Sequence, residues 1–410
     1  MTLDLLNLPT APQSTTDRAA HWSAMSAAVA DLSGPVAAIS LPALRRNALD
    51  LVVRAGGVPI RVASKSVRVG GLLAATLALP GFRGIMAYTL PEALWLAETF
   101  DDVLVGYPTA DRAALAQLAA DERAASRITL MVDDAAHLDL VDAVAAPTQR
   151  AALRLAIDAD ASWRTPGLGH IGVHRSPLRE PADVAALART IVARPGFRLV
   201  GLMMYEAQIA GQPDASGSGA DAVVRWMQGR SAEELRRRRA AITAALRGIA
   251  PLEFVNGGGT GSLETTAADE AVTELTAGSG LLAGHLFDGY RAFDPLPAAA
   301  FSLEVVRKPA DDIVTLLGGG WAASGPAGRS REPLAVWPEG LRPLAREGYG
   351  EVQTPLQGEA ARRLRIGDRV WLRHAKSGEL SEHVDRFHLV SGGERVGEMP
   401  TYRGEGKVFL

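Results

Sequence analysis

Short apolar runs separated by amphipathic segments constrain the fold of this chain more than any other feature. Segments with helical spacing, such as residues 90–100 and 111–123, lie between most of the runs. Eight strand and helix units predict an α/β fold built on a closed (β/α)8 barrel, with an open doubly wound sheet as the alternative. The runs are VPIRVA (58–63), GIMAYT (84–89), DVLVGY (102–107), ITLMVD (128–133), LRLAID (153–158), LVGLMMY (199–205), LEFVN (252–256) and VTELTAG (272–278).

The pattern changes after residue 295, where short alternating strands such as AFSLEVVRK and DRVWLRHA are punctuated by Gly and Pro. This predicts a separate antiparallel β domain, which the strand PVAAISL (35–41) is expected to join. We therefore expect an N-terminal segment over 1–41 that partly joins the β domain, a barrel over 42–295 and a C-terminal β domain over 296–410. A charged amphipathic helix is predicted over 231–250, with its four consecutive arginines on a solvated face.

Composition removes several classes of function. The chain has no cysteine, which excludes disulfides, thiolate nucleophiles and sulfur-ligated metals. Its formal net charge of −3 gives no reason to expect nucleic acid or a membrane surface as a partner, so a small molecule is the expected substrate. No apolar run reaches membrane-spanning length, and the first residues lack the pattern of a signal peptide, so a cytoplasmic location is expected.

Lysine is rare in this chain, and one of its four lysines follows the first predicted strand directly. Lys65 lies in RVASKSVRV (61–69), whereas nearly all other fixed positive charge is arginine. An amine can lose its proton and attack a carbonyl, which a guanidinium does not do. Because active sites of barrels lie at the C-terminal ends of the strands, Lys65 is a candidate for Schiff-base chemistry, with an ordinary surface lysine as the alternative.

Two glycine-rich stretches follow the seventh and eighth predicted strands. They are VNGGGTGS (255–262) and AGSG (277–280), and Gly258, Gly259, Thr260, Gly278 and Ser279 are their candidate binding residues. Consecutive glycines let backbone N–H groups converge on an anion, and barrels commonly bind phosphate with these two loops. Tight turns without a ligand are the alternative.

A reactive lysine opposite a phosphate-binding loop is the layout that pyridoxal 5'-phosphate requires. Two further residues follow predicted strands and are candidates to contact the ring of that cofactor. Tyr205 ends the sixth run, and Arg164 follows the fifth. A core ring for Tyr205 and a surface cation for Arg164 are the alternatives.

At these residues the sequence resembles the alanine-racemase-like, fold-type III family of pyridoxal-phosphate enzymes, and within it the D-threonine aldolase and D-serine dehydratase branch with the amino acid deaminase/aldolase proteins. Lys65 resembles the cofactor lysine of the family, NGGGTGS its phosphate loop and PVAAISLPALRRNAL (35–49) its entry segment. The resemblance implies a barrel joined to a β domain, and a homodimer whose active site is completed at the interface.

In that branch, the resemblance implies a pair of metal ligands in the C-terminal domain. His374 occupies the first ligand position here, but the second is Lys376, which while protonated has no lone pair for a metal. Either a divalent metal (Mn, Mg or Zn) remains on His374 with ligands such as Glu379 or His383, or the Lys376 ammonium replaces part of its work. A lost or weakened metal site is favoured, and surface groups near a turn are the third possibility.

The resemblance implies a lyase acting on β-hydroxy D-amino acids, with Lys65, His374 and Lys376 as catalytic candidates. Retro-aldol cleavage to glycine and an aldehyde is favoured over dehydration, and both reactions need a cationic group at the β-oxygen. An amino-acid racemase is an alternative that would use Tyr349 or Tyr402 as a second base. A non-enzymatic pyridoxal-phosphate carrier is another, although a carrier has no evident need for the second domain.

Overall fold

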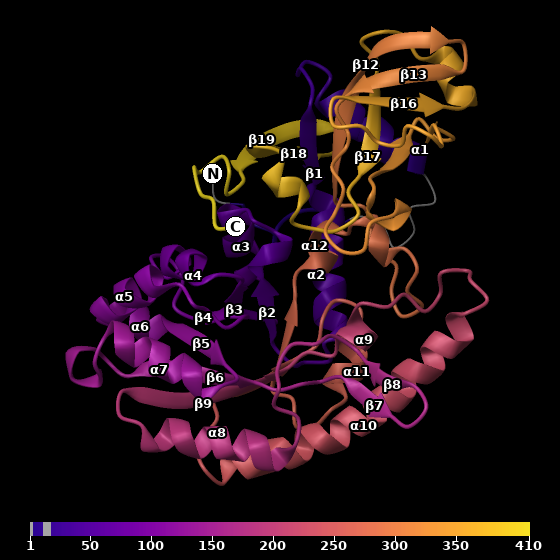
Figure 1. The fold of residues 1–410 in the computed structure, drawn as a ribbon. Helices are drawn as coiled ribbons and strands as arrows, with labels where there is room; N and C mark the ends of the chain where they lie inside the picture. Colours follow the sequence, from indigo (N-terminus) through magenta and orange to yellow (C-terminus); the bar gives the residue numbers. More distant parts are fainter. Residues whose placement is uncertain (1–2, 11–17) are drawn as a thin grey trace.

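A closed barrel and a mostly antiparallel sheet make up the computed structural model, which describes residues 3–10 and 18–410. Residues 1–2 and 11–17, inside the predicted N-terminal segment, lie outside the described part. Figure 1 shows the sheet domain stacked at one side of the barrel, with α2 (Leu41–Arg54) and α12 (Ser279–Leu282) between the two. None of the helices in the described ranges combines the length and the apolar character needed to cross a bilayer.

Each of the eight predicted apolar runs overlaps a barrel strand, and the strands pair in parallel around a closed ring. The last strand pairs with the first through Leu275 and Ile60, which excludes the open sheet that was the alternative prediction. Inside the barrel Met86, Leu104 and Met131 pack against Phe254. The strands are β2 (Ile60–Ala63), β3 (Phe82–Ala87), β4 (Val103–Val105), β5 (Ile128–Val132), β6 (Leu153–Asp158), β9 (Phe197–Met204), β10 (Phe254–Gly257) and β11 (Glu274–Ala277).

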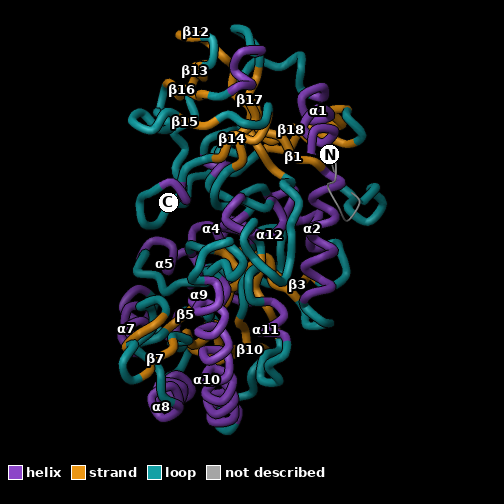
Figure 2. Tube along the Cα trace, turned by 90° about the vertical axis from the view of Figure 1, so that its right-hand side faces the viewer, coloured by secondary structure: helices purple, strands orange, loops and turns teal. Residues whose placement is uncertain are grey.

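Helices cover the outside of the barrel, and the long helix α10 (Asp221–Arg247) runs beside α8 (Pro181–Ala193) along one flank (Figure 2). Several helices begin where a side-chain oxygen accepts from a free backbone N–H, as Asp111 does for Ala114. The remaining helices are α1 (Arg18–Ala28), α3 (Gly70–Leu77), α4 (Leu90–Leu96), α5 (Arg112–Ala120), α6 (Glu122–Arg127), α7 (Ala135–Val144), α9 (Ala207–Ala210) and α11 (Leu263–Ala267).

The second domain is a nine-stranded sheet in which β1 (Val36–Ser40) pairs antiparallel with β12 (Ala299–Ala310) and parallel with β18 (Arg386–Ser391). An early segment of the chain is thus central to a late domain. The other strands are β13 (Ile313–Leu317), β14 (Leu334–Trp337), β15 (Arg342–Pro343), β16 (Gln353–Gln357), β17 (Arg369–Arg373) and β19 (Glu394–Pro400). Short 3-10 turns cover Ser64–Ser66, Pro147–Gln149, His285–Phe287, Arg329–Arg331, Glu359–Arg363 and Leu380–Glu382.

A small hairpin, β7 (Trp163–Thr165) with β8 (Gly169–Ile171), interrupts the connection from β6 to α8. The apolar pattern did not predict it, because the two strands are short and half exposed.

The prediction that all four arginines of residues 236–239 face solvent is wrong for two of them. Arg238 and Arg239 are buried, whereas Arg236 and Arg237 are exposed. Since α10 repeats every 3.6 residues, positions 238 and 239 fall on the same face as Leu235 and Ile242, which packs on the barrel. Their charges are balanced by buried acceptors, so the run of like charge is divided between solvent and core.

Candidate active site

The turn after the first barrel strand presents the amine of Lys65 to open space. Ser64 and Ser66 on either side of it are buried, and the Ser64 hydroxyl donates to the carbonyl of Met86 at 3.0 Å. The guanidinium of Arg68 donates to the Lys65 carbonyl at 3.0 Å, so the backbone is held on both sides. The exposed side chain extends from this fixed turn, and its Nζ donates to the hydroxyl of Tyr107 at 3.1 Å.

The two glycine-rich loops meet each other beside this turn. Thr260 Oγ1 accepts from the Ser279 hydroxyl and from the N–H of Gly280, both at 3.0 Å. A Cβ on Gly278 would lie 2.5 Å from the carbonyl oxygen of Ala63, so only glycine permits this approach to the strand that leads into Lys65. The loops after β10, β11 and β2 therefore form one continuous surface.

A buried ion-pair network supports the backbone of the first glycine-rich loop, which follows β10. Glu206 accepts from the N–H of Gly258 at 3.3 Å and from the Ser262 hydroxyl at 2.9 Å. Arg239 pairs with Glu206 at 3.0 Å and with Asp269 at 2.6 Å. Gly258 has φ +83°, which glycine adopts without strain. Arg239 lies on α10, and its charge and those of Glu206 and Asp269 are all paired. The network therefore fixes the conformation of the loop relative to this helix.

Two tyrosines and one arginine line another side of the opening at the C-terminal ends of the barrel strands, which we call the mouth. A Cβ on Gly259 would lie 3.1 Å from Cε2 of Tyr205, so the Tyr205 ring lies against the glycine loop. The guanidinium carbon of Arg175 is 5.0 Å from the Tyr205 ring centre and 5.6 Å from that of Tyr107. Arg175 and Tyr107 were not predicted from the sequence. Tyr107 ends a predicted strand run, and that position at a barrel mouth was the signal available for it.

Ionisation of these groups follows from burial and nearby charge. Burial raises the pKa of Tyr205 to about 12. Burial also raises the pKa of Tyr107, but the Lys65 ammonium and the Arg175 guanidinium lower it by more, so the net shift is downward. Burial raises the pKa of Asp158, at the end of β6, to about 7, although Arg175 opposes this.

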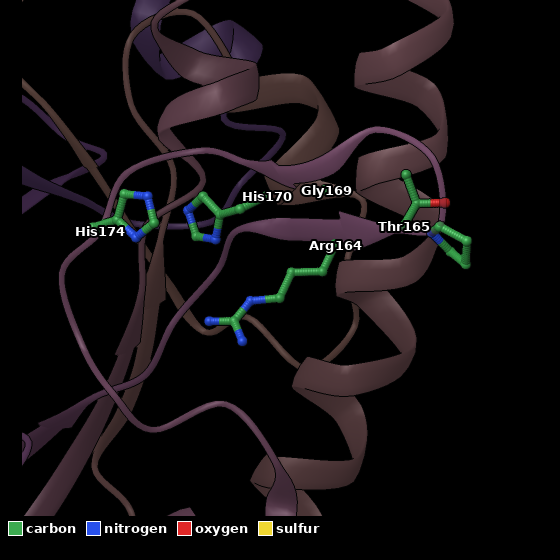
Figure 3. A pocket seen from close by; sticks show the side chains of 6 residues that line it. Arg164, Thr165, Gly169, His170 and His174 are labelled. Carbon is green, nitrogen blue, oxygen red and sulfur yellow. The ribbon is translucent and has the colours of Figure 1, made fainter.

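Arg164 lies on the hairpin and not among these rings. Its guanidinium pairs with Asp160 at 3.1 Å, and its side chain is half exposed. Figure 3 shows it beside His170 and His174, whose rings stack at 3.9 Å, in a surface pocket of about 600 Å³. Arg175 is thus the cation against the aromatic wall of the mouth, and a cofactor contact for Arg164 remains a prediction.

The β domain reaches the Lys65 turn through the loop that follows β17. The Ser381 hydroxyl donates to the carbonyl of Val67 at 2.8 Å, and Arg68 pairs with Glu382 at 2.7 Å. Lys376 lies on the same loop, and its Nζ donates to the carbonyl and hydroxyl oxygens of Ser324 at 3.1 and 2.8 Å. Burial lowers the pKa of Lys376, Glu379 opposes this, and the Lys65 ammonium lowers it again.

The residues suggested as metal ligands do not form a metal site. His374 is buried, its Nε2 lies 3.4 Å from the Ser377 hydroxyl, and burial together with Arg373 lowers its pKa to about 3. The ring of His383 stacks on Trp321 at 4.7 Å. Glu379 accepts from the N–H of Ser324. Across residues 3–10 and 18–410, no three His, Cys, Asp or Glu side chains gather where they could share an ion. The side chains present therefore do not fit a metal.

The residues do fit a phosphorylated aldehyde. Lys65 supplies an amine at one side of the mouth, and glycines 258, 259 and 278 keep the other side free of side chains. Within the described part of the chain, the N–H groups of Thr260 and Gly261 donate to no protein acceptor, which leaves them for an anion. Amine, anion-binding backbone and aromatic wall are the groups that pyridoxal phosphate needs.

Comparison with known proteins supports this assignment. Residues 39–282 match the model of the family described as alanine racemase, N-terminal domain. The chain belongs to this family. The match to the alanine racemase N-terminal domain family covers the barrel, since it begins within β1 and ends at the last residue of α12. The family resemblance predicted from the sequence is confirmed.

Comparison with individual proteins gives more specific similarities than the family match does. A D-threonine aldolase of Arthrobacter sp. is 31% identical over 268 residues, which cover 63% of this chain and 64% of that protein, so the match spans slightly less than two thirds of its length. The D-threonine aldolase of Filomicrobium marinum superposes with a TM-score of 0.77 at 19% identity, covering 93% of this chain and 97% of that one. D-threo-3-hydroxyaspartate dehydratase from Delftia sp. HT23 superposes with a TM-score of 0.72 at 21% identity, covering 91% and 98%.

Proposed function

We propose that this chain is a pyridoxal-phosphate-dependent lyase acting on β-hydroxy D-amino acids, and that it cleaves them to glycine and an aldehyde. The observation that carries the proposal is the approach of two amines from different domains. Lys65 comes from the barrel and Lys376 from the β domain. The loop of Lys376 is held to the Lys65 turn by the contacts of Ser381 and Glu382 described above, and the Lys65 charge lowers the pKa of Lys376. The similarity to a D-threonine aldolase supports the choice of reaction.

Each side of the mouth has a separate task in binding. Lys65 would hold the aldehyde end of the cofactor. The free N–H groups of Thr260 and Gly261 would bind the phosphate of the cofactor. Tyr205 would limit the position of the ring, because it is wedged against Gly259. Arg175 would keep that part of the mouth positive. Bound pyridoxal phosphate supplies an electron sink for negative charge at the substrate Cα.

The β-oxygen of the substrate needs a cation, and Lys376 supplies it in this proposal. An ammonium beside a hydroxyl favours its deprotonation, which the cleavage of the Cα–Cβ bond requires. Ser324 fixes the amine through two hydrogen bonds and so sets where the β-oxygen would lie. Removal of the β-hydroxyl as water is the alternative reaction with the same groups, and the dehydratase among the structural neighbours is the reason to retain it.

Product analysis separates these reactions. The purified holoenzyme is incubated with D-threonine, D-allothreonine, D-serine and D-threo-3-hydroxyaspartate, and aldehyde, glycine, oxo acid and ammonia are measured. Formation of an aldehyde with equimolar glycine supports the aldolase reaction, whereas formation of an oxo acid with ammonia shows that the enzyme is a dehydratase. If none of the four amino acids is turned over although the cofactor is bound, the lyase is refuted and the non-enzymatic carrier is the remaining hypothesis.

A racemase would need a second base, and neither tyrosine suggested for it has a free hydroxyl. Tyr402 is buried and donates to Glu92 at 2.9 Å, while the Tyr349 hydroxyl accepts from the N–H of Ala335 at 3.2 Å. Burial raises the pKa of both phenols. Deuterium uptake at Cα from deuterated buffer, without cleavage, would favour racemisation instead.

The homodimer is part of the same proposal, and light scattering of the holoenzyme tests it.

A further inference from the structure

The contact between Lys65 and Tyr107 joins two titratable groups, and the binding roles given above do not account for it. The Nζ of Lys65 donates to the Tyr107 hydroxyl at 3.1 Å, within the range for direct proton exchange. Tyr107 lies two residues beyond the end of β4, at the same mouth as Lys65 but on a different strand. Its backbone position is therefore fixed by the barrel, and the two groups converge from separate walls.

The charges around the Tyr107 hydroxyl favour its phenolate. Lys65 and Arg175 are the cations that act on it, Asp158 acts in the opposite sense, and Lys376 and Tyr205 complete the set of titratable groups that face it from neighbouring elements. The cations prevail, so its pKa is lowered. The other five tyrosines, Tyr88, Tyr205, Tyr290, Tyr349 and Tyr402, all have raised pKa values. Tyr107 alone among the six has a lowered pKa and is therefore the tyrosine expected to lose its proton first as pH rises.

A lysine that serves as nucleophile and base must repeatedly lose its proton. At neutral pH the ammonium is the ordinary state of a lysine, so an uncharged amine needs an acceptor within reach. The carboxylate of Asp158 has no hydrogen bond to Nζ among the described residues, whereas Tyr107 does. We propose that Tyr107 is the proton partner of Lys65: its phenolate oxygen takes a proton from the Nζ ammonium and later returns it.

The exchange is balanced without any further reagent. One N–H bond of the ammonium breaks and leaves its electron pair on Nζ, while an electron pair of the phenolate forms the O–H bond. Lys65 then has the lone pair to attack a carbonyl or to remove a substrate proton. The reverse transfer restores the ammonium as a proton donor for the product. Nothing is oxidised or reduced.

One half of the test does not depend on substrate. Phenolate absorbance of the cofactor-free full-length chain is followed from pH 6 upward. The wild type is expected to show one tyrosine that ionises before the rest. Tyr107→Phe should lose this early component, and Lys65→Ala should shift it to higher pH because the neighbouring cation is gone. Tyr349→Phe, which changes a partly buried tyrosine in the β domain, is the matched control and should keep it.

The other half rests on the proposed function. In the holoenzyme, Tyr107→Phe should bind the cofactor as the wild type does but lower kcat by about 10²-fold or more, with KM much less affected. The fall in kcat at acidic pH should disappear, since the group that must be deprotonated is absent. An early component that survives in Tyr107→Phe, or an unchanged kcat, overturns the inference. If no β-hydroxy amino acid is turned over, the proposed function fails while the absorbance titration still decides the Lys65–Tyr107 partnership.

Discussion

The backbone of Gly378, in the β domain, lies directly against the carbonyl of Lys65 in the barrel. A Cβ on Gly378 would fall 1.9 Å from that oxygen, and the residue has φ +92°. The loop that carries Lys376 is therefore seated on the turn that carries Lys65. Two domains that are distant in the sequence fix the relative positions of the two amines.

Replacing Gly378 with alanine should separate the two amines. The backbone must move to relieve the overlap with Lys65, so Gly378→Ala is expected to lower kcat strongly and to reduce cofactor affinity. Gly367→Ala is the matched control, because Gly367 has φ +93° but nothing within 4 Å of the added Cβ. It carries only the cost of the left-handed conformation, about 1 kcal/mol. Equal effects of the two substitutions on kcat would show that the contact between Gly378 and Lys65 does not position the two amines.

Removing the buried arginine of α10 should loosen the glycine loop. Arg239→Met leaves Glu206 and Asp269 buried without their partner, and we expect a loss of about 3–5 kcal/mol in unfolding free energy. Cofactor affinity should fall as well. The neighbouring Arg237→Met removes an exposed pair with Glu233 and should change stability by less than about 0.5 kcal/mol. Chemical denaturation and cofactor titration measure both, and similar losses in the two variants would contradict the network.

Lys376 should matter for turnover more than for cofactor binding. Lys376→Met is expected to lower kcat by at least about 10²-fold with the cofactor still bound, because the β-oxygen loses its cation. Since the pKa of Lys376 is lowered, wild-type activity should fall on the alkaline side as its ammonium is lost, and the variant should lack this dependence. Lys308→Met, in the β domain, is the control, since Lys308 donates to the carbonyls of Arg362 and Leu364. A fully active Lys376→Met enzyme would remove its role.

Asp158 should make the cofactor-free chain less stable at higher pH. Its pKa is about 7 in the folded chain and 3.8 as its reference value, so the folded state binds the proton more tightly. The free energy of unfolding therefore falls as pH rises from about 4 to about 7, by up to about 4 kcal/mol from this group. Asp158→Asn lacks this fall and should gain stability over the wild type between pH 5 and pH 8. Urea midpoints that run parallel for both proteins would show that Asp158 is not the buried acid.

The barrel and the position of its two glycine-rich loops were predictable because their signals are local. A buried strand in a parallel sheet is a short apolar run, and all eight runs were visible. The glycine loops and Lys65 follow directly from where those runs end. Tyr107 and Arg175 were not predicted, since a single tyrosine or arginine has no periodicity and only the closed barrel brings them to Lys65. The burial of Arg238 and Arg239 was predictable in principle from their spacing with Leu235 and Ile242, but a run of four like charges normally indicates a solvated face.

Chemical trapping of the lysine tests the central claim most directly. The holoenzyme is reduced with borohydride and digested, and the modified peptide is identified by mass spectrometry. With only four lysines in the chain, at positions 65, 308, 376 and 407, the assignment is unambiguous. We predict a visible absorbance band that disappears on reduction and a pyridoxyl group on Lys65, both absent in Lys65→Ala. A protein that binds no cofactor, or an adduct on one of the other three lysines, would contradict the account.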